Sequence, residues 1–122
     1  MMLDISFYSE KECLDTMQVT DDFYQWLGQS MFPKIGRFEK KMMQADEESV
    51  DISVIRLEGE NRRKFSDFFR DAIVQESDQV MEKLGDSPSK DEYTETTSRL
   101  KKLQELRKMI EDEKFKYFSY AD

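Results

Sequence analysis

The sequence predicts an α+β fold: a mostly helical single domain over residues 1–122, with a small two- or three-stranded sheet and a long C-terminal helical hairpin. Two observations lead to this prediction. Two short segments alternate apolar and polar residues with the period of a strand, and two long segments carry apolar residues at helical spacing. The chain is also long enough, with 12% aromatic residues, to bury one hydrophobic core without help.

Two segments are predicted to be strands. Residues 3–8 alternate apolar and polar side chains, and residues 50–57 do the same with many β-branched side chains. Helices are expected between them, so the two strands would pair in parallel through a crossover. In register, that pairing would bring Asp4 close to Asp51 at an electrostatic cost, which a bound cation or a basic partner would relieve.

The stretch that follows the first strand is predicted to form a helix. Ser9 and Glu12 have the spacing of a capping box, in which each side chain satisfies a free backbone N–H group at the helix start. This helix would run to about Gln18 and carry Cys13 into the core.

A second helix is expected to begin directly afterwards. Thr20 is a suitable N-cap, and Asp21 and Asp22 complement the positive end of the helix dipole. The helix should end near Met31, because Pro33 disfavours helical geometry at the residue before it. A short third helix is expected from the helical spacing of three apolar residues, although a glycine within it weakens the prediction: Ile35, Phe38 and Met42.

The C-terminal half predicts two long helices packed as an antiparallel hairpin. The first follows Gly59 and runs to Leu84. The second starts either at Ser87, with a proline in its first turn, or at Ser89 with a capping box, and carries a leucine-rich stripe. The aromatic residues 115–120 either extend this helix or form a third strand, and the pattern leaves both open.

Composition excludes most kinds of chemistry. The chain has no histidine, one cysteine and a net charge of −8. Without histidine or paired cysteines, the usual nucleophiles, metal sites and proton carriers are missing, so we expect a protein that is not an enzyme and that binds no metal or cofactor. The negative charge argues against nucleic-acid binding. The absence of a signal peptide or membrane-spanning stretch predicts a cytoplasmic protein.

The excess of acidic residues is local. Residues 1–33 carry six acids and one base, and residues 50–60 carry three acids and one base. Within these segments, acids lie beside aromatic side chains, an arrangement suited to receiving Arg or Lys from a partner. The predicted partner-binding residues are Asp4, Asp21, Asp22, Tyr24, Trp26 and Asp51. In the alternative interpretation Trp26 belongs to the core and the aspartates only cap the helix.

Three functions remain after these exclusions. The leading prediction is a non-catalytic acidic binding protein of the immunity or inhibitor type, which neutralises a basic protein partner such as a toxin nuclease by covering its site. The alternative is a structural or adaptor protein, of phage or plasmid type, that forms homodimers or larger oligomers through its C-terminal helices. The third is a small carboxylate-dependent enzyme, for which Glu76 is the candidate because it interrupts an apolar stripe.

Overall fold

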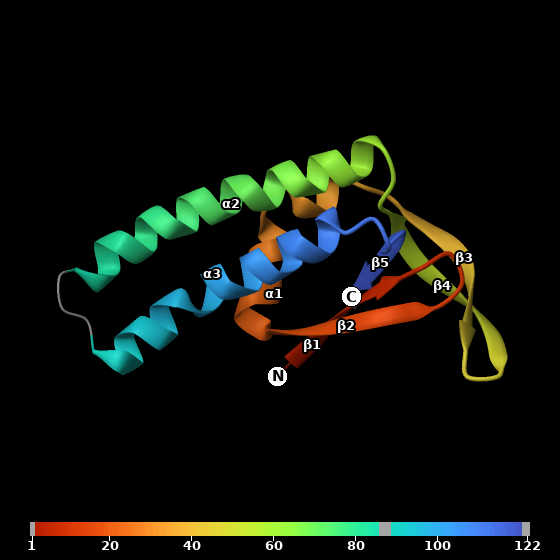
Figure 1. Cartoon of the computed structure of the whole chain (residues 1–122), viewed down its shortest axis with the longest axis horizontal. Coiled ribbons are helices and arrows are strands. Elements are labelled where there is room, and N and C mark those ends of the chain that lie inside the picture. Colours follow the sequence, from red (N-terminus) through yellow and green to blue (C-terminus); the bar gives the residue numbers. More distant parts are fainter. Residues whose placement is uncertain (1, 86–88, 121–122) are drawn as a thin grey trace.

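A computed structural model describes residues 2–85 and 89–120 of the chain (Figure 1). Strands and helices follow one another along the sequence in the order β-β-α-β-β-α-α-β, with one turn of 3-10 helix after the first α-helix. Their bounds are β1 Met2–Tyr8, β2 Cys13–Thr20, α1 Asp21–Gln29, η1 Phe32–Lys34, β3 Phe38–Ala45, β4 Glu48–Arg56, α2 Glu60–Leu84, α3 Lys90–Glu111 and β5 Tyr117–Tyr120.

The five strands form one antiparallel sheet in the order β2-β1-β5-β4-β3. The prediction of a mostly helical fold with a two- or three-stranded sheet was therefore wrong. The parallel pairing of the two predicted strands was also wrong, because β5 lies between β1 and β4 and is antiparallel to both. Since antiparallel neighbours can be joined by tight turns, the β1–β2 and β3–β4 pairs need no crossover helix.

The helix expected over residues 9–18 is instead the turn after β1 and most of β2. The contact that suggested a helix start does exist, but it closes a turn: the Ser9 hydroxyl accepts from the N–H groups of Lys11 and Glu12, both at 3.2 Å. Serine makes such contacts in turns as well as at helix caps. Cys13 is exposed, so its predicted place in the core was wrong.

The short helix expected over residues 35–42 was also wrong in its main part, since Phe38–Ala45 is strand β3. Its Lys, Met, Gln and Ala residues favour helix intrinsically, but pairing with β4 along the whole strand overrides that preference. Within β3 only Met43 is fully buried, which explains why the sequence shows little strand periodicity there.

The C-terminal aromatic segment forms β5, the central strand of the sheet. Tyr117 and Phe118 are almost completely buried, one on each face of the sheet. The segment that the sequence left undecided is therefore the one that joins the two halves of the sheet.

The predicted α1, α2 and α3 helices are confirmed, as are two of their caps. The Thr20 hydroxyl accepts from the Phe23 N–H at 3.2 Å, and the Ser89 hydroxyl accepts from the Glu92 N–H at 3.1 Å. The alternative start at Ser87 lies outside the described residues. In Figure 1 α2 and α3 form a long antiparallel hairpin whose far end extends well beyond the sheet.

Apolar side chains are buried on both faces of the sheet. The larger cluster lies between the sheet and the helices, and Phe32 of η1 is at its centre, with rings of α2 and β5 around it at centroid distances of 5.3–5.9 Å. The smaller cluster lies on the opposite face and consists of Tyr8, Met43, Val54 and Tyr117. Both faces of β4 are therefore covered near its C-terminal end.

One edge of the sheet is covered by the β1–β2 turn. The Gln44 N–H of β3 donates to the Lys11 carbonyl at 2.7 Å, and Lys41 pairs with Glu10 at 3.2 Å. These contacts curl the sheet so that β3 meets the beginning of β2. The remainder of β2, from Thr16 onward, has no strand beyond its outer edge in the described structure.

Arg62 fixes the end of α3 and the approach to β5. Its guanidinium donates to the carbonyl oxygens of Ile110, Asp112 and Phe115 at 2.8, 3.0 and 2.7 Å. Burial lowers the pKa of the Arg62 guanidinium, which still carries its charge at neutral pH. No helix in the described ranges is long and apolar enough to cross a membrane.

Candidate binding surface

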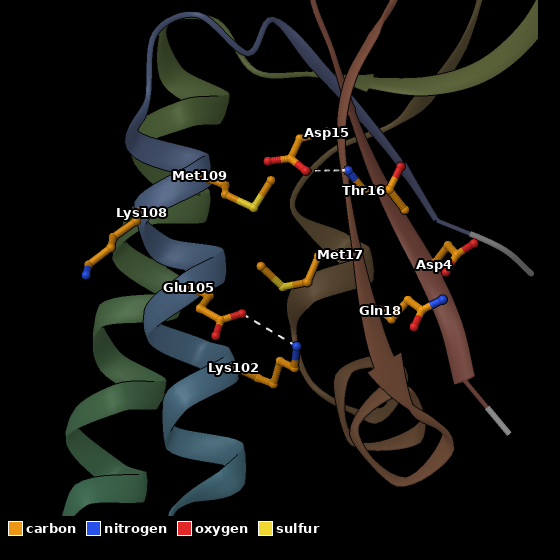
Figure 2. Close-up of a pocket in the computed structure, with 9 residues that line it drawn as sticks. All are labelled: Asp4, Asp15, Thr16, Met17, Gln18, Lys102, Glu105, Lys108 and Met109. Atoms are coloured by element: carbon orange, nitrogen blue, oxygen red, sulfur yellow. Dashed lines mark hydrogen bonds and ion pairs between the residues drawn. The ribbon is translucent and has the colours of Figure 1, made fainter.

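A groove of about 720 Å³ runs between the open edge of β2 and helix α3 (Figure 2). Its residues come from β1, β2 and α3: Asp4, Asp15, Thr16, Met17, Gln18, Lys102, Glu105, Lys108 and Met109. Ligand sites in proteins commonly have volumes of about 300–1,000 Å³, so the groove is large enough to take a segment of a partner chain.

The side of β2 that faces α3 is apolar at its centre. Figure 2 shows Met17 and Met109 pointing toward each other across the groove, with Glu105 and Lys102 beside them on α3. Lys102 and Glu105 form an ion pair at 3.5 Å. Methionine side chains adapt to differently shaped partners, so the pair suits a floor that accepts apolar side chains.

The opposite side of β2 is polar. Side chains alternate along a strand, so Thr16 and Gln18 point away from the helices while Met17 and Val19 point toward the core. Gln18 pairs across the strand with Asp4, whose carboxylate therefore lies on the same polar side. A segment lying along β2 would meet methionines on one side and the polar residues Thr16 and Gln18 on the other, with Asp4 on the next strand.

The outer backbone groups of β2 are open to a partner. In an antiparallel ladder every second residue directs its N–H and C=O away from the neighbouring strand. The Thr16 N–H donates to the Asp15 carboxylate at 2.8 Å rather than to a strand carbonyl, which identifies Thr16 as an outward residue. Gln18, two residues later, shares that direction. Only Asp15 occupies this row of groups among the described side chains.

Asp21 and Asp22, two of the predicted site residues, are exposed in the first turn of α1, directly after β2. Asp22 also lines a second pocket of about 530 Å³ between α1, α2 and α3, which shares Lys102 with the groove. Asp4, Asp21 and Asp22 are thus brought to the β1–β2–α1 side of the protein.

The two predicted aromatic anchors are largely engaged inside the protein. Trp26 is half-buried against Phe23 and Phe68, and the guanidinium of Arg99 lies 5.4 Å from the centre of its ring. Tyr24 is half-buried with its ring 6.1 Å from that of Tyr120. The ring of Trp26 that was expected to receive a partner's arginine therefore already carries an arginine of its own chain.

Asp51 is not brought together with Asp4. Asp51 lies on β4 opposite Met42, on the sheet face that Ile55 shares with the helices. Asp4 lies on the other face, because its neighbour Ile5 is the residue that points to the helices. Since β5 also separates β1 from β4, the electrostatic cost expected from close pairing of the two aspartates does not arise.

Glu76, the candidate for a carboxylate enzyme, lines the second pocket with Asp22. Its side chain is 12% exposed and lies 3.9 Å from Arg99, the residue that covers Trp26. A carboxylate neutralised by an arginine is well suited to holding that arginine in place. Across residues 2–85 and 89–120, no group of three His, Cys, Asp or Glu side chains could hold a metal ion.

The sequence did not predict the groove itself. Its β2 wall lies in a segment that was expected to be helical, and its α3 wall comes from residues far away in the chain. One signal was present: Met17 and Val19, the buried residues of β2, alternate with polar ones in a stretch that contains β-branched threonines.

Comparisons with known proteins assign the chain to no family, since no family model, curated protein or solved structure matches it.

Proposed function

We propose that this protein is a non-catalytic binding protein that recognises a basic protein partner through β2 and the segments on either side of it. The observation that carries the proposal is the charge of this region. Residues 10–22 contain five acids and one base, and they lie along a sheet edge that leaves backbone groups open beside a groove. Clustered charge of one sign accelerates encounter with a partner of opposite sign.

The kind of partner that fits best is a basic enzyme whose site would be covered, as in an immunity or inhibitor protein acting on a toxin nuclease. Acids at both ends of β2 would pair with the lysines and arginines that such an enzyme uses to hold phosphates. The proposal includes a cytoplasmic location, in keeping with a single cysteine that is free and exposed.

The experiment is a comparison of two double substitutions that remove the same charge. The partner is first isolated with a tagged chain from the native host. Its binding is then measured at several salt concentrations for Asp21→Asn with Asp22→Asn, and for Asp46→Asn with Glu47→Gln at the β3–β4 turn. Asparagine accepts the positive φ of Asp46, so the control keeps its turn.

The first pair should slow association about tenfold at low salt and flatten its salt dependence, while the control pair should change both far less. Equal effects of the two pairs would mean that net charge alone matters and that the proposed surface is wrong.

A second candidate is an adaptor that self-associates through the α2–α3 hairpin. It is favoured by three large apolar side chains that stay exposed on these helices: Val74 at 62%, Met81 at 77% and Tyr93 at 50%. Light scattering over a range of concentrations tests it, because a chain that remains monomeric at high concentration does not assemble through this hairpin.

A further inference from the structure

We propose that the partner is recognised as an extended segment that adds to β2 as a sixth strand and lies in the groove between β2 and α3. This inference rests on the proposed function and specifies the form in which the partner's basic residues are presented. Adding a strand to an exposed sheet edge is a common way to bind a peptide: main-chain hydrogen bonds provide affinity and alternate side chains provide specificity.

The two edges of the sheet differ in a way that favours β2. The edge at β3 is covered where the Lys11 carbonyl accepts from the Gln44 N–H and Glu10 pairs with Lys41. The edge at β2 has no strand beyond it from Thr16 onward in the described structure. A strand laid there would be separated from β2 by about 4.8 Å and would enter the groove.

In the free protein the Asp15 side chain occupies the backbone N–H group that an added strand would use. Its carboxylate accepts from the outward Thr16 N–H at 2.8 Å. When a carbonyl of the bound segment takes over that N–H group, the Asp15 carboxylate is released toward the groove. The exchange replaces a contact within β2 by a hydrogen bond of the new ladder.

The side chains around the groove define the sequence that fits. Residues of the segment that point toward α3 meet Met17 and Met109, so they should be apolar. Residues that point the other way lie beside Thr16 and Gln18 of β2. Asp4 lies one strand further on, at about 9.6 Å, where a lysine or arginine side chain can reach it, so these residues should be basic. The flanking carboxylates of Glu12, Asp21 and Asp22 extend this preference to both ends of the segment.

Charge also distinguishes a basic segment from a second copy of this chain. Two β2 edges paired with each other would bring together two regions that each hold five acids and one base. Like charges placed opposite each other on neighbouring strands are destabilising, so self-pairing is opposed where pairing with a basic segment is favoured.

The test uses the peptide Arg-Val-Lys-Leu-Arg-Val-Lys with blocked ends, and the full isotope-labelled chain observed by NMR. The informative variant is Gln18→Pro, which removes one outward N–H but leaves the net charge and the ladder to β1 unchanged, because proline is tolerated on an edge strand where its nitrogen faces solvent. Gln18→Ala is the matched control, since it removes the same side chain and keeps the N–H.

The peptide should shift the amide signals of β2 and slow hydrogen exchange of the Gln18 amide. Its affinity should be about tenfold lower for Gln18→Pro than for Gln18→Ala, as expected for losing a hydrogen bond and its neighbours in a ladder. The same peptide methylated on alternate backbone nitrogens should bind as weakly, and this comparison does not depend on whether the proline variant folds.

Equal binding by both Gln18 variants and by the methylated peptide would overturn strand addition. If the Asp21→Asn, Asp22→Asn double variant still bound the basic peptide more weakly, the proposed function would stand without strand addition. If the acidic peptide Asp-Val-Glu-Leu-Asp-Val-Glu bound as well as the basic one and remained sensitive to Gln18→Pro, the preference for a basic partner would be wrong instead. If the free chain formed dimers and Gln18→Pro abolished them, the occupant of the edge would be a second copy of this chain, and the inference would be overturned.

Discussion

Replacement of Arg62 tests how the central strand is held in place. Arg62 lies in the first turns of α2, and its guanidinium bonds to three carbonyl groups at the end of α3 and in the connection to β5. Arg62→Met keeps most of the aliphatic stem and removes all three donors. Arg62→Lys keeps the charge but not the planar fork that reaches three acceptors at once.

The cost follows from these contacts. A hydrogen bond to a charged group contributes about 1.5–3 kcal/mol when it is fully shielded from water. The Arg62 side chain is only partly buried, and water can replace part of what is lost, so about half of the summed contribution is a reasonable expectation. Arg62→Met should therefore lower the free energy of unfolding by about 2–4 kcal/mol, and Arg62→Lys by about 1–2 kcal/mol.

Urea denaturation followed by circular dichroism and by the fluorescence of Trp26, the single tryptophan, gives these free energies. The matched control is Arg63→Met. Arg63 is the adjacent arginine, and its pair with Glu60 is exposed, so its loss should destabilise the fold far less than the loss of Arg62. Similar losses for the Arg62 and Arg63 variants would refute the role given to Arg62.

Two further predictions concern packing and pH. A methyl group at Gly36 would come within 2.6 Å of the Ile55 side chain, so Gly36→Ala should destabilise the fold by about 1–3 kcal/mol in thermal unfolding. Gly28 is exposed on α1 with open space around it, so Gly28→Ala should stabilise the fold by up to about 1 kcal/mol. Equal effects would contradict the close approach. Hydrogen bonds from Arg70 hold the pKa of Glu111 below its ordinary value of 4.5, so the stability that it contributes is present above that value and is lost as the pH falls through the folded pKa. Glu111→Gln should accordingly cost about 1 kcal/mol at neutral pH, and the difference from the unsubstituted chain in urea midpoint should shrink below pH 4.5; a difference that is independent of pH would count against this assignment.

The parts of the fold that the sequence predicted are those encoded by neighbouring residues. Thr20 and the two aspartates after it predict the start of helix α1, and Ser89 predicts the start of α3. In each case the capping hydroxyl accepts from an N–H three residues later. Strand β4 could be predicted because β-branched residues recur at alternate positions, of which Ile52 and Val54 pack on one face of the sheet. Local chemistry was sufficient for these elements.

The remaining strands depend on partners that are distant in the chain. β3 is made of helix-favouring residues and forms a strand because it pairs with β4. β5 is short, and its position at the centre of the sheet is set by β1 on one side and β4 on the other. The contact at Ser9 shows why local sequence did not predict these strands, since the same bonds between a serine hydroxyl and backbone N–H groups occur in a helix cap and in this turn.

The candidate site divides in the same way. Charge is a property of the sequence, so the acidic character of residues 1–33 could be predicted, including Asp4, Asp21 and Asp22. The sheet topology is not visible in the sequence, so the sequence could not show that Asp51 lies on the opposite face of the sheet from Asp4. Nor could the sequence show that Arg99, from α3, already lies over Trp26.

The open edge of β2 bears on why acids are placed there. An unpaired edge invites association, and proteins commonly protect it with charged side chains, most often lysine. Protection alone would be served by either sign of charge, since both repel an identical copy. A protected edge also needs no groove beside it, yet β2 faces a methionine-lined groove of about 720 Å³. Acids along this edge repel a second copy and attract a basic strand, and an incoming strand needs only to displace the Asp15 carboxylate from the Thr16 N–H that it covers in the free protein.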